Sequence, residues 1–273
     1  IISVYDKTGI IDFARALHKQ KVTLISTGGT YALLSEQAGL PVKKVSDVVG
    51  FPEILNGRVK TLHPRIHGGL LAKRDRLEHM AELNEHDIEP IDIVVSNLYP
   101  FVETVKSPNV TMDLALENID IGGPTLLRAA AKNFPSVTVI SDPSDYDWVA
   151  EKMATGSISI EERQKLASKA FSHVSQYDAV VAQYLSIQDN QGLPSNVILS
   201  FIKAYDLRYG ENPHQQGALY RHPVGSGGLP DSVLLHGKQL SFNNIMDAHS
   251  AWCIARDFWS ATVAIIKHSN PCG

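Results

Sequence analysis

The chain has 273 residues, of which 44% are hydrophobic and 20% are charged, and its formal net charge is -4. This is the composition of an ordinary globular protein, and the acidic balance argues against a general nucleic-acid surface. No apolar run approaches the ~20 residues of a membrane-spanning helix, and no signal peptide is recognisable. We therefore expect a cytoplasmic protein without a membrane partner, and its two cysteines, Cys253 and Cys272, fit a reducing compartment.

The length indicates one complete domain followed by part of another. The chain begins with Ile1-Ile2 rather than Met and stops at Gly273, soon after an apolar run at residues 262–266 that predicts a strand. Both observations lead us to expect a truncated chain.

Short β-branched runs predict four strands, at residues 1–5, 22–26, 91–96 and 137–141. They alternate with segments of helical period, and apolar strands of this kind are typical of a parallel sheet covered on both faces. We therefore expect an α/β fold, a three-layer α/β/α domain over residues 1–190.

The end of this domain carries helix signals. Asp142-Pro143 predicts a helix start, and Ser159 with Glu162 predicts a capping box for a helix that reaches about Ile187. One face of that helix is apolar and predicts core packing: Leu166, Ala170, Phe171, Val174, Tyr177, Val181 and Tyr184. Residues 190–194 are typical of a linker, so a second domain is expected over 196–273.

Two glycine-containing turns follow the first two predicted strands. They comprise Lys7, Thr8 and Gly9 after the first strand, and Ser26, Thr27, Gly28, Gly29 and Thr30 after the second. Backbone N–H groups, hydroxyls and a helix start at such turns bind phosphate, although any strand-to-helix turn also favours small residues. Two turns at neighbouring strand ends favour phosphate binding.

A long loop, residues 49–70, carries Arg58, Lys60, Thr61 and two histidines. It is too long for a mere connector in a compact α/β domain, so either a site or a solvated basic loop is expected. His63 and His67 do not predict a metal site, because Pro64 interrupts a helical pair and no carboxylate is suitably spaced.

Further polar residues follow the third predicted strand and precede a helix. Asn97 and Tyr99 end that strand, and Asp120 and Gly122 precede a helix that carries Lys132. Each has a structural explanation as a turn, a cap or an exposed face.

Together these motifs resemble the bifunctional family that joins phosphoribosylaminoimidazolecarboxamide formyltransferase to inosine monophosphate cyclohydrolase. The resemblance extends over essentially the whole chain in the family's order: SVYDKTG, STGGT, GFPEILNGRVKTLHPRIHGGLLA, NLYPF, IDIGGPTLLRAAAKN, LRYGENPHQ and IIKHSNPCG. It implies a homodimer that acts on purine nucleotide intermediates in the last two steps of de novo purine biosynthesis.

For the first domain the resemblance implies a methylglyoxal-synthase-like fold and the cyclohydrolase reaction, in which formylaminoimidazole carboxamide ribonucleotide closes to inosine monophosphate with loss of water. No metal or organic cofactor is implied. The implied catalytic cluster is Lys60, Tyr99, Asp120 and Lys132. The implied nucleotide contacts are the two turns together with Arg58, Thr61, Asn97 and Gly122.

For residues 196–273 the resemblance implies the start of a cytidine-deaminase-like α/β transformylase domain. There the amino group of aminoimidazole carboxamide ribonucleotide takes the formyl group of the co-substrate 10-formyltetrahydrofolate. The implied residues are Lys267 and His268 for catalysis, and Arg208, Tyr209, His214 and Asn244 for the nucleotide. Formyl transfer is not expected of this chain alone, and Cys272 is not expected to be a nucleophile.

Two alternatives remain open. A phosphate-binding regulatory module of the methylglyoxal-synthase-like fold would keep STGGT but would not need the four catalytic side chains together. Methylglyoxal synthase itself would lack the segment beyond residue 195.

Overall fold

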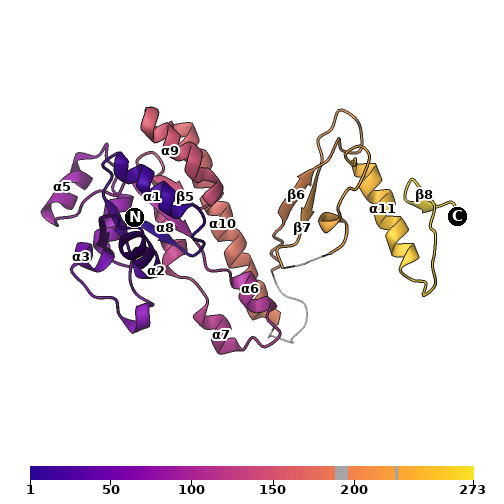
Figure 1. Ribbon diagram of the computed structural model, residues 1–273, viewed down its shortest axis with the longest axis horizontal. Coiled ribbons are helices and arrows are strands. Elements are labelled where there is room, and N and C mark those ends of the chain that lie inside the picture. The colour runs from indigo at the N-terminus through magenta and orange to yellow at the C-terminus, as the bar shows by residue number, and fades with distance from the viewer. Residues whose placement is uncertain (188–195, 225–226) are drawn as a thin grey trace. The chain divides into compact units, whose positions relative to one another are not determined.

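The computed structural model of the protein describes residues 1–187, 196–224 and 227–273. The chain divides into two compact units, Ile1–Asp189 and Asn190–Gly273. The predicted linker at residues 190–194 lies outside the described residues. In chain order the first unit contains β1 (Ile2–Val4), α1 (Ile10–Lys19), β2 (Leu24–Ser26), α2 (Gly28–Tyr31), the π-helix η1 (Ala32–Gln37), β3 (Val42–Lys44), α3 (Val45–Val49), the 3-10 turn η2 (Leu55–Gly57), α4 (Pro64–Leu71), α5 (Leu77–Glu85), β4 (Ile93–Asn97), α6 (Phe101–Lys106), α7 (Met112–Glu117), α8 (Gly122–Lys132), β5 (Thr138–Ile140), the 3-10 turn η3 (Pro143–Asp145), α9 (Tyr146–Thr155) and α10 (Ile160–Ile187) (Figure 1).

The first unit is built on one parallel sheet of five strands in the order β3-β2-β1-β4-β5. All five residues of β4 are buried, as expected for a strand covered on both faces. This confirms the predicted α/β class. The sequence did not predict β3, because two of its three residues are exposed lysines and it lies at the edge of the sheet.

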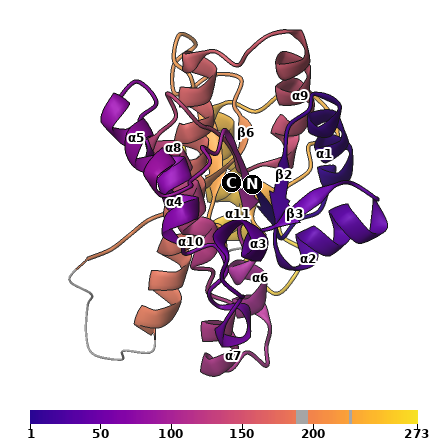
Figure 2. The same ribbon diagram turned by 90° about the vertical axis from the view of Figure 1, so that its left-hand side faces the viewer.

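Helices cover both faces of the sheet. One group consists of α4, α8 and α10, in which α8 contacts both of the others, and a second group consists of α1 and α9, which contact each other. Figure 2 shows the two groups on opposite sides of the strands. For α1, α4 and α8, which connect strands, this division follows from right-handed crossovers, because the connections run in opposite directions from the central strand β1. The largest fully buried side chains of the core include Ile10, Leu17, Leu70, Phe101 and Leu127.

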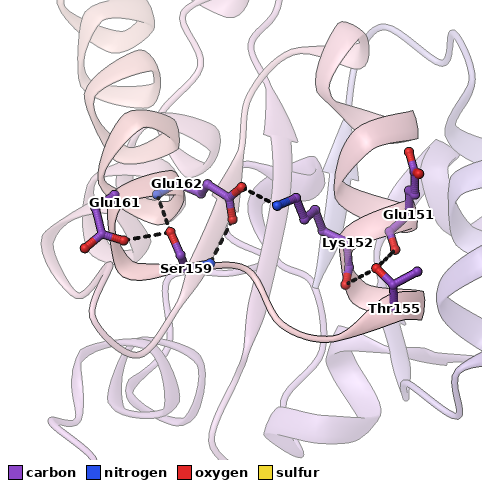
Figure 3. A network of polar contacts seen from close by, with 6 residues as sticks. All are labelled: Glu151, Lys152, Thr155, Ser159, Glu161 and Glu162. Carbon is purple, nitrogen blue, oxygen red and sulfur yellow. Dashed lines mark hydrogen bonds and ion pairs between the residues drawn. The ribbon is translucent and has the colours of Figure 1, made fainter.

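The start of α10 has the predicted capping box. The backbone N–H of Glu162 donates to the Ser159 hydroxyl at 3.2 Å, and the Ser159 N–H donates to Glu162 Oε2 at 2.9 Å (Figure 3). Glu162 also pairs with Lys152 of α9 at 2.8 Å, which joins the two helices. The face predicted to be buried is buried at Leu166, Ala170, Val174 and Tyr177.

The prediction for Phe171 of α10 was wrong. Its side chain is 40% exposed, and the guanidinium of Arg128 lies over its ring at 5.8 Å from the centroid. Phe171 directly follows Ala170, which is fully buried, and adjacent helical positions point about 100° apart.

The second unit contains less regular structure. Its elements are β6 (Ile202–Asp206), β7 (Ala218–Arg221), the 3-10 turn η4 (Leu229–Asp231), α11 (Phe242–Ala255), β8 (Ile266–Lys267) and β9 (Asn270–Pro271). The strands form two separate antiparallel pairs, β6-β7 and β8-β9. The strand predicted at residues 262–266 was wrong except at Ile266, because Thr262 and Val263 are exposed. Ile265 lies outside β8 but exchanges backbone hydrogen bonds with Cys272 and Gly273, at 2.8 and 2.7 Å. In the part of the chain that is described, we find no helix with the length and apolarity needed to cross a membrane.

Candidate active site

Most of the predicted site residues of the first unit line a cavity of about 720 Å³ at the carboxyl edge of the sheet. The connections leave the central strand β1 in opposite directions, toward β2 and toward β4, and ligands of open α/β sheets bind where the strand order reverses in this way. The cavity is lined by Ser3, Val4, Tyr5, Lys7, Thr27, Gly28, Gly29, Thr30, Asn56, Gly57, Arg58, Lys60, Thr61, Leu62, Asn97, Tyr99, Leu116, Glu117, Asn118, Ile119, Asp120, Ile121, Gly122 and Gly123.

The glycine turn after β2 forms one wall of the cavity. Gly28 has a φ of 54°, and a Cβ atom there would lie 3.3 Å from Lys60 Nζ, so both the backbone conformation and the approach of the lysine favour glycine. The Thr30 hydroxyl donates to the Val4 carbonyl at 3.0 Å and accepts from Lys7 Nζ at 3.0 Å. Burial lowers the pKa of Lys7. A lysine and a glycine turn are thus fixed next to each other at this wall.

Lys60 is carried by a short hairpin in the long loop. Ile54 and Val59 pair as an isolated antiparallel bridge, and the turn between them contains Asn56 and Gly57, both with positive φ. Glu53 and Lys60 flank this bridge, and their charged groups lie 3.6 Å apart. The hairpin therefore fixes the position from which the Lys60 side chain reaches into the cavity.

The same loop carries Arg58, which pairs with Glu117 of α7. The loop is shorter than predicted, because Pro64 begins α4 and His63 caps it, its Nδ1 accepting from the N–H of Arg65 at 3.2 Å. Pro64 therefore starts a helix here rather than interrupting one, since proline is well tolerated in the first turn. Within the described residues no group of three His, Cys, Asp or Glu side chains lies close enough together to hold a metal ion.

Asp120 lies in the connection that precedes α8. Its Oδ1 accepts from the N–H of Gly123 at 2.9 Å, while its own N–H donates to the Tyr177 hydroxyl at 2.7 Å. A Cβ atom at Gly123 would lie 2.6 Å from Asp120 Oδ2, so only glycine lets the carboxyl group occupy this place. Burial raises the pKa of Asp120, against the lowering effect of hydrogen bonds from backbone N–H groups.

Tyr99 follows β4 and contacts Tyr5, which follows β1. The two ring centroids are 5.0 Å apart and the planes are tilted by 49°. Between the two strand ends, Asn97 Oδ1 accepts from the N–H groups of Tyr5 at 2.6 Å and Asp6 at 2.9 Å. The Asn97 amide thus holds the two strand ends together.

Not every predicted residue reaches the cavity. Lys132 is the last residue of α8, whereas Gly122 and Gly123 at the first turn line the cavity, so about 15 Å of helix separates Lys132 from them, and its side chain is exposed. Ser26 is fully buried and donates to the Ile2 carbonyl at 2.7 Å, while Thr8 and Gly9 lie outside the lining. The placement of these four residues in the cavity therefore needs correction.

The predicted residues of the second unit gather around α11. The N–H of Phe242, at the helix start, donates to the Tyr209 carbonyl at 3.1 Å, and the Arg208 guanidinium lies over the Tyr209 ring at 4.9 Å. Asn244 completes a capping box with Ser241. His214 is exposed.

Lys267 and His268 lie at the hairpin between β8 and β9. His268 and Ser269 both have positive φ, 53° and 61°, as a two-residue type I′ hairpin requires. The Ser269 N–H donates to Asp247 of α11 at 2.7 Å, so this hairpin is tied to the helix. Both Lys267 and His268 are exposed.

The sequence did not identify Glu53, Tyr5 or Tyr177 as parts of the site. Tyr5 directly follows a predicted strand, so the rule that ligands bind at strand ends could have found it. Glu53 reaches Lys60 only through the hairpin, and Tyr177 reaches Asp120 from a distant helix. The sequence contains no spacing that signals either contact.

Two family models match the chain. A model described as MGS-like domain matches residues 9–125, and one described as AICARFT/IMPCHase bienzyme matches residues 130–273. The fold and the site thus define an α/β protein with a methylglyoxal-synthase-like domain. The chain belongs to the AICARFT/IMPCHase bienzyme family, which confirms the resemblance found in its motifs.

Similar proteins agree with this assignment. Proteins named bifunctional purine biosynthesis protein PurH are 52% identical over 275 residues in Halalkalibacterium halodurans and 53% over 274 residues in a Thermoanaerobacter species. Each alignment covers all of this chain and 54% of the relative, so the chain spans about half the length of these relatives. A solved structure titled Crystal structure of ForH is 36% identical, with a TM-score of 0.60, over 68% of this chain and 97% of that one.

Proposed function

We propose that the first unit is an inosine monophosphate cyclohydrolase, a hydrolase acting on cyclic amidines. It closes formylaminoimidazole carboxamide ribonucleotide to inosine monophosphate with loss of water. One observation carries the proposal. Lys60, Tyr99 and Asp120 lie in three separate loops, and together with a glycine turn they line one cavity. Family membership and the names of the relatives support it.

The reaction needs proton transfer and charge stabilisation. The carboxamide nitrogen attacks the formyl carbon and loses one proton, and the formyl oxygen gains one to become a hydroxyl group. This hydroxyl group then leaves as water with a second proton, which comes from the formamido N–H as a C=N bond forms between that nitrogen and the former formyl carbon. Lys60 and Tyr99 supply donors for the oxygen as it gains charge, and Asp120 supplies a carboxylate that orients the reacting groups. Because the reaction is intramolecular, holding the formyl group near the amide supplies much of the rate. This proposal gives the domain no cofactor.

The phosphate of the substrate is proposed to lie at Lys7 and the turn of Thr27–Thr30. Backbone N–H groups of a glycine turn and a neighbouring ammonium bind phosphate well. Arg58, Thr61, Asn97 and Gly122, which also line the cavity, complete the proposed nucleotide pocket. Lys132, exposed at the far end of α8, is left out of this proposal.

For the second unit we propose a part in formyl transfer from 10-formyltetrahydrofolate to aminoimidazole carboxamide ribonucleotide, with His268 as the base and Lys267 as the cation. The match of residues 130–273 to the bienzyme model supports this role. A homodimer is proposed from the family resemblance. A cytoplasmic location is proposed because both cysteines are free.

The experiment follows ring closure spectrophotometrically, with the formylated nucleotide as substrate and variants Lys60→Ala and Tyr99→Phe. We expect wild-type turnover and a loss of about 100-fold or more in each variant, with unchanged circular dichroism. Glu82→Gln, an exposed carboxylate on α5, is the matched control. A wild-type chain that binds phosphate without turnover would favour the regulatory module instead, and wild-type rates in a folded double variant would refute the catalytic cluster.

A further inference from the structure

Tyr5 is a half-exposed aromatic side chain at the cavity, outside the catalytic set named above. It lines the cavity, 50% of it is exposed, and its ring contacts that of Tyr99, which is 48% exposed. A centroid distance of 5.0 Å lies in the range preferred by aromatic pairs. Together the two rings form an aromatic surface that the protein itself covers only in part.

The backbone fixes the position of this surface. The Asn97 amide accepts from the N–H groups of Tyr5 and Asp6, and its Nδ2 donates to the Asp6 carbonyl at 3.1 Å. Three hydrogen bonds from one buried side chain thus hold the segment after β1 against the end of β4. The backbone segment that carries the Tyr5 ring is therefore already ordered before a ligand covers it, so binding costs little backbone entropy.

The surroundings of Tyr5 define the ligand chemistry. Lys7, two residues further along, also lines the cavity and donates to Thr30 of the glycine turn. A ligand whose anionic group reaches Lys7 therefore brings its adjoining part close to Tyr5. Leu116 and Ile121, both more than 40% exposed, add apolar surface to the same cavity. A cation and hydroxyl groups together with aromatic and aliphatic side chains match a molecule with a phosphate and a planar ring.

We propose that Tyr5 is a specificity-determining residue whose ring, with that of Tyr99, stacks on the heterocyclic base of the nucleotide. The inference rests on the proposed function, since it names the base subsite of the same cavity. Stacking of a base on an aromatic side chain stabilises the complex, and a ligand that has no base gains no stacking from the ring.

The test compares two ligands by isothermal titration calorimetry on the full 273-residue chain: inosine monophosphate and ribose 5-phosphate. We expect Tyr5→Ala to weaken binding of the nucleotide by about tenfold or more, and binding of ribose 5-phosphate by less than about twofold. Tyr5→Phe keeps the ring and is expected to bind both ligands like the wild type. Tyr5→Leu keeps apolar volume without the ring and is expected to lose most of the nucleotide affinity. Thermal unfolding of each variant checks that it is folded.

The outcomes separate this inference from the enzyme assignment. Equal weakening of both ligands in Tyr5→Ala, or loss of affinity in Tyr5→Phe, would mean that Tyr5 serves the sugar-phosphate or acts through its hydroxyl, and would overturn the inference. Unchanged affinity for inosine monophosphate in Tyr5→Ala would also overturn the inference. So would a wild-type chain that binds no inosine monophosphate. If the nucleotide is bound and Tyr5 contributes as expected but no ring closure occurs, the base subsite stands and the cyclohydrolase proposal fails.

Discussion

Asp120 illustrates how the protein changes the chemistry of a single residue. Burial raises the pKa of its carboxyl group above the ordinary value of 3.8. A raised pKa in the folded state means that the folded protein binds this proton more tightly than the unfolded chain, so ionisation of Asp120 lowers stability as pH rises through the raised pKa. The site therefore holds a carboxylate at a cost in stability, which is common among catalytic acids and bases.

The pH dependence of ring closure follows from this shift. If the ionised carboxylate is the active form, activity falls as pH drops through the raised pKa, and the acid limb lies above pH 3.8. We expect Asp120→Asn to reduce kcat by about 100-fold and to abolish this limb. Steady-state kinetics between about pH 4 and pH 8 measures kcat and the acid limb. The control is Asp113→Asn, which changes an exposed carboxylate on α7. An acid limb that persists in Asp120→Asn would assign it to another group.

Glu53 is a positioning residue that links two parts of the cavity. It accepts from the Thr27 hydroxyl and pairs with Lys60. Glu53→Gln keeps an acceptor for Thr27 but removes the charge beside Lys60, whereas Glu53→Ala removes both. Since about a third of each side chain is exposed, solvent screens the pair, and we expect Glu53→Gln to lower kcat by about three- to tenfold.

Comparing the effects of the Glu53 substitutions on kcat and on KM tests whether Glu53 acts by positioning Lys60. KM should change by less than about threefold in Glu53→Gln and rise in Glu53→Ala, where Thr27 of the proposed phosphate turn also loses its partner. Glu82→Gln is the control. If kcat of Glu53→Ala equals that of the wild type, the contact with Lys60 has no catalytic consequence.

Among the elements, α10 is the helix whose start was most fully predicted. Ser159→Ala removes the cap seen in Figure 3, and we expect a loss of about 1 kcal/mol in the free energy of unfolding. Ser157→Ala, two residues earlier and exposed, should change it by less than about 0.5 kcal/mol. Urea unfolding followed by circular dichroism measures both, and equal effects of the two substitutions would show that the capping box contributes nothing.

The predictability of each element depends on whether its signal is local. Apolar runs predicted β1, β2, β4 and β5, and the Ser159–Glu162 spacing predicted the start of α10, because strand burial and helix capping depend on neighbouring residues. The turn at Thr27–Thr30 and the residues Tyr99 and Asp120 were assigned by motif. The contact of Glu53 with Lys60 depends on the fold of the hairpin, and that of Tyr177 with Asp120 depends on tertiary packing between distant segments. Lys132 was assigned by motif and lies at the opposite end of α8 from the cavity.

The second unit differs from the first in how much apolar surface it buries. Within residues 196–224 and 227–273 the buried hydrophobic side chains are Leu207 and Ile245, whereas Trp252, Phe258 and Trp259 are more than half exposed. Large exposed apolar surfaces of this kind mark contacts with other parts of a protein or with a partner.

We therefore expect no measurable formyl transfer from 10-formyltetrahydrofolate by the 273-residue chain, because Lys267 and His268 lie on an exposed hairpin. Absorbance of the folate product measures the reaction, with ring closure in the same sample as the positive control. Turnover that depends on His268 would show that this unit suffices for formyl transfer.

The cavity is assembled from five stretches of the first unit, residues 3–7, 27–30, 56–62, 97–99 and 116–123. Contacts between stretches so far apart carry a large loop-closure cost and form late when a chain refolds. Because all five stretches line the cavity, we expect affinity for the proposed nucleotide to return only after the sheet and its connections are complete. Binding of the proposed nucleotide would therefore report a completed cavity, and by mass action it would shift the equilibrium away from the unfolded chain.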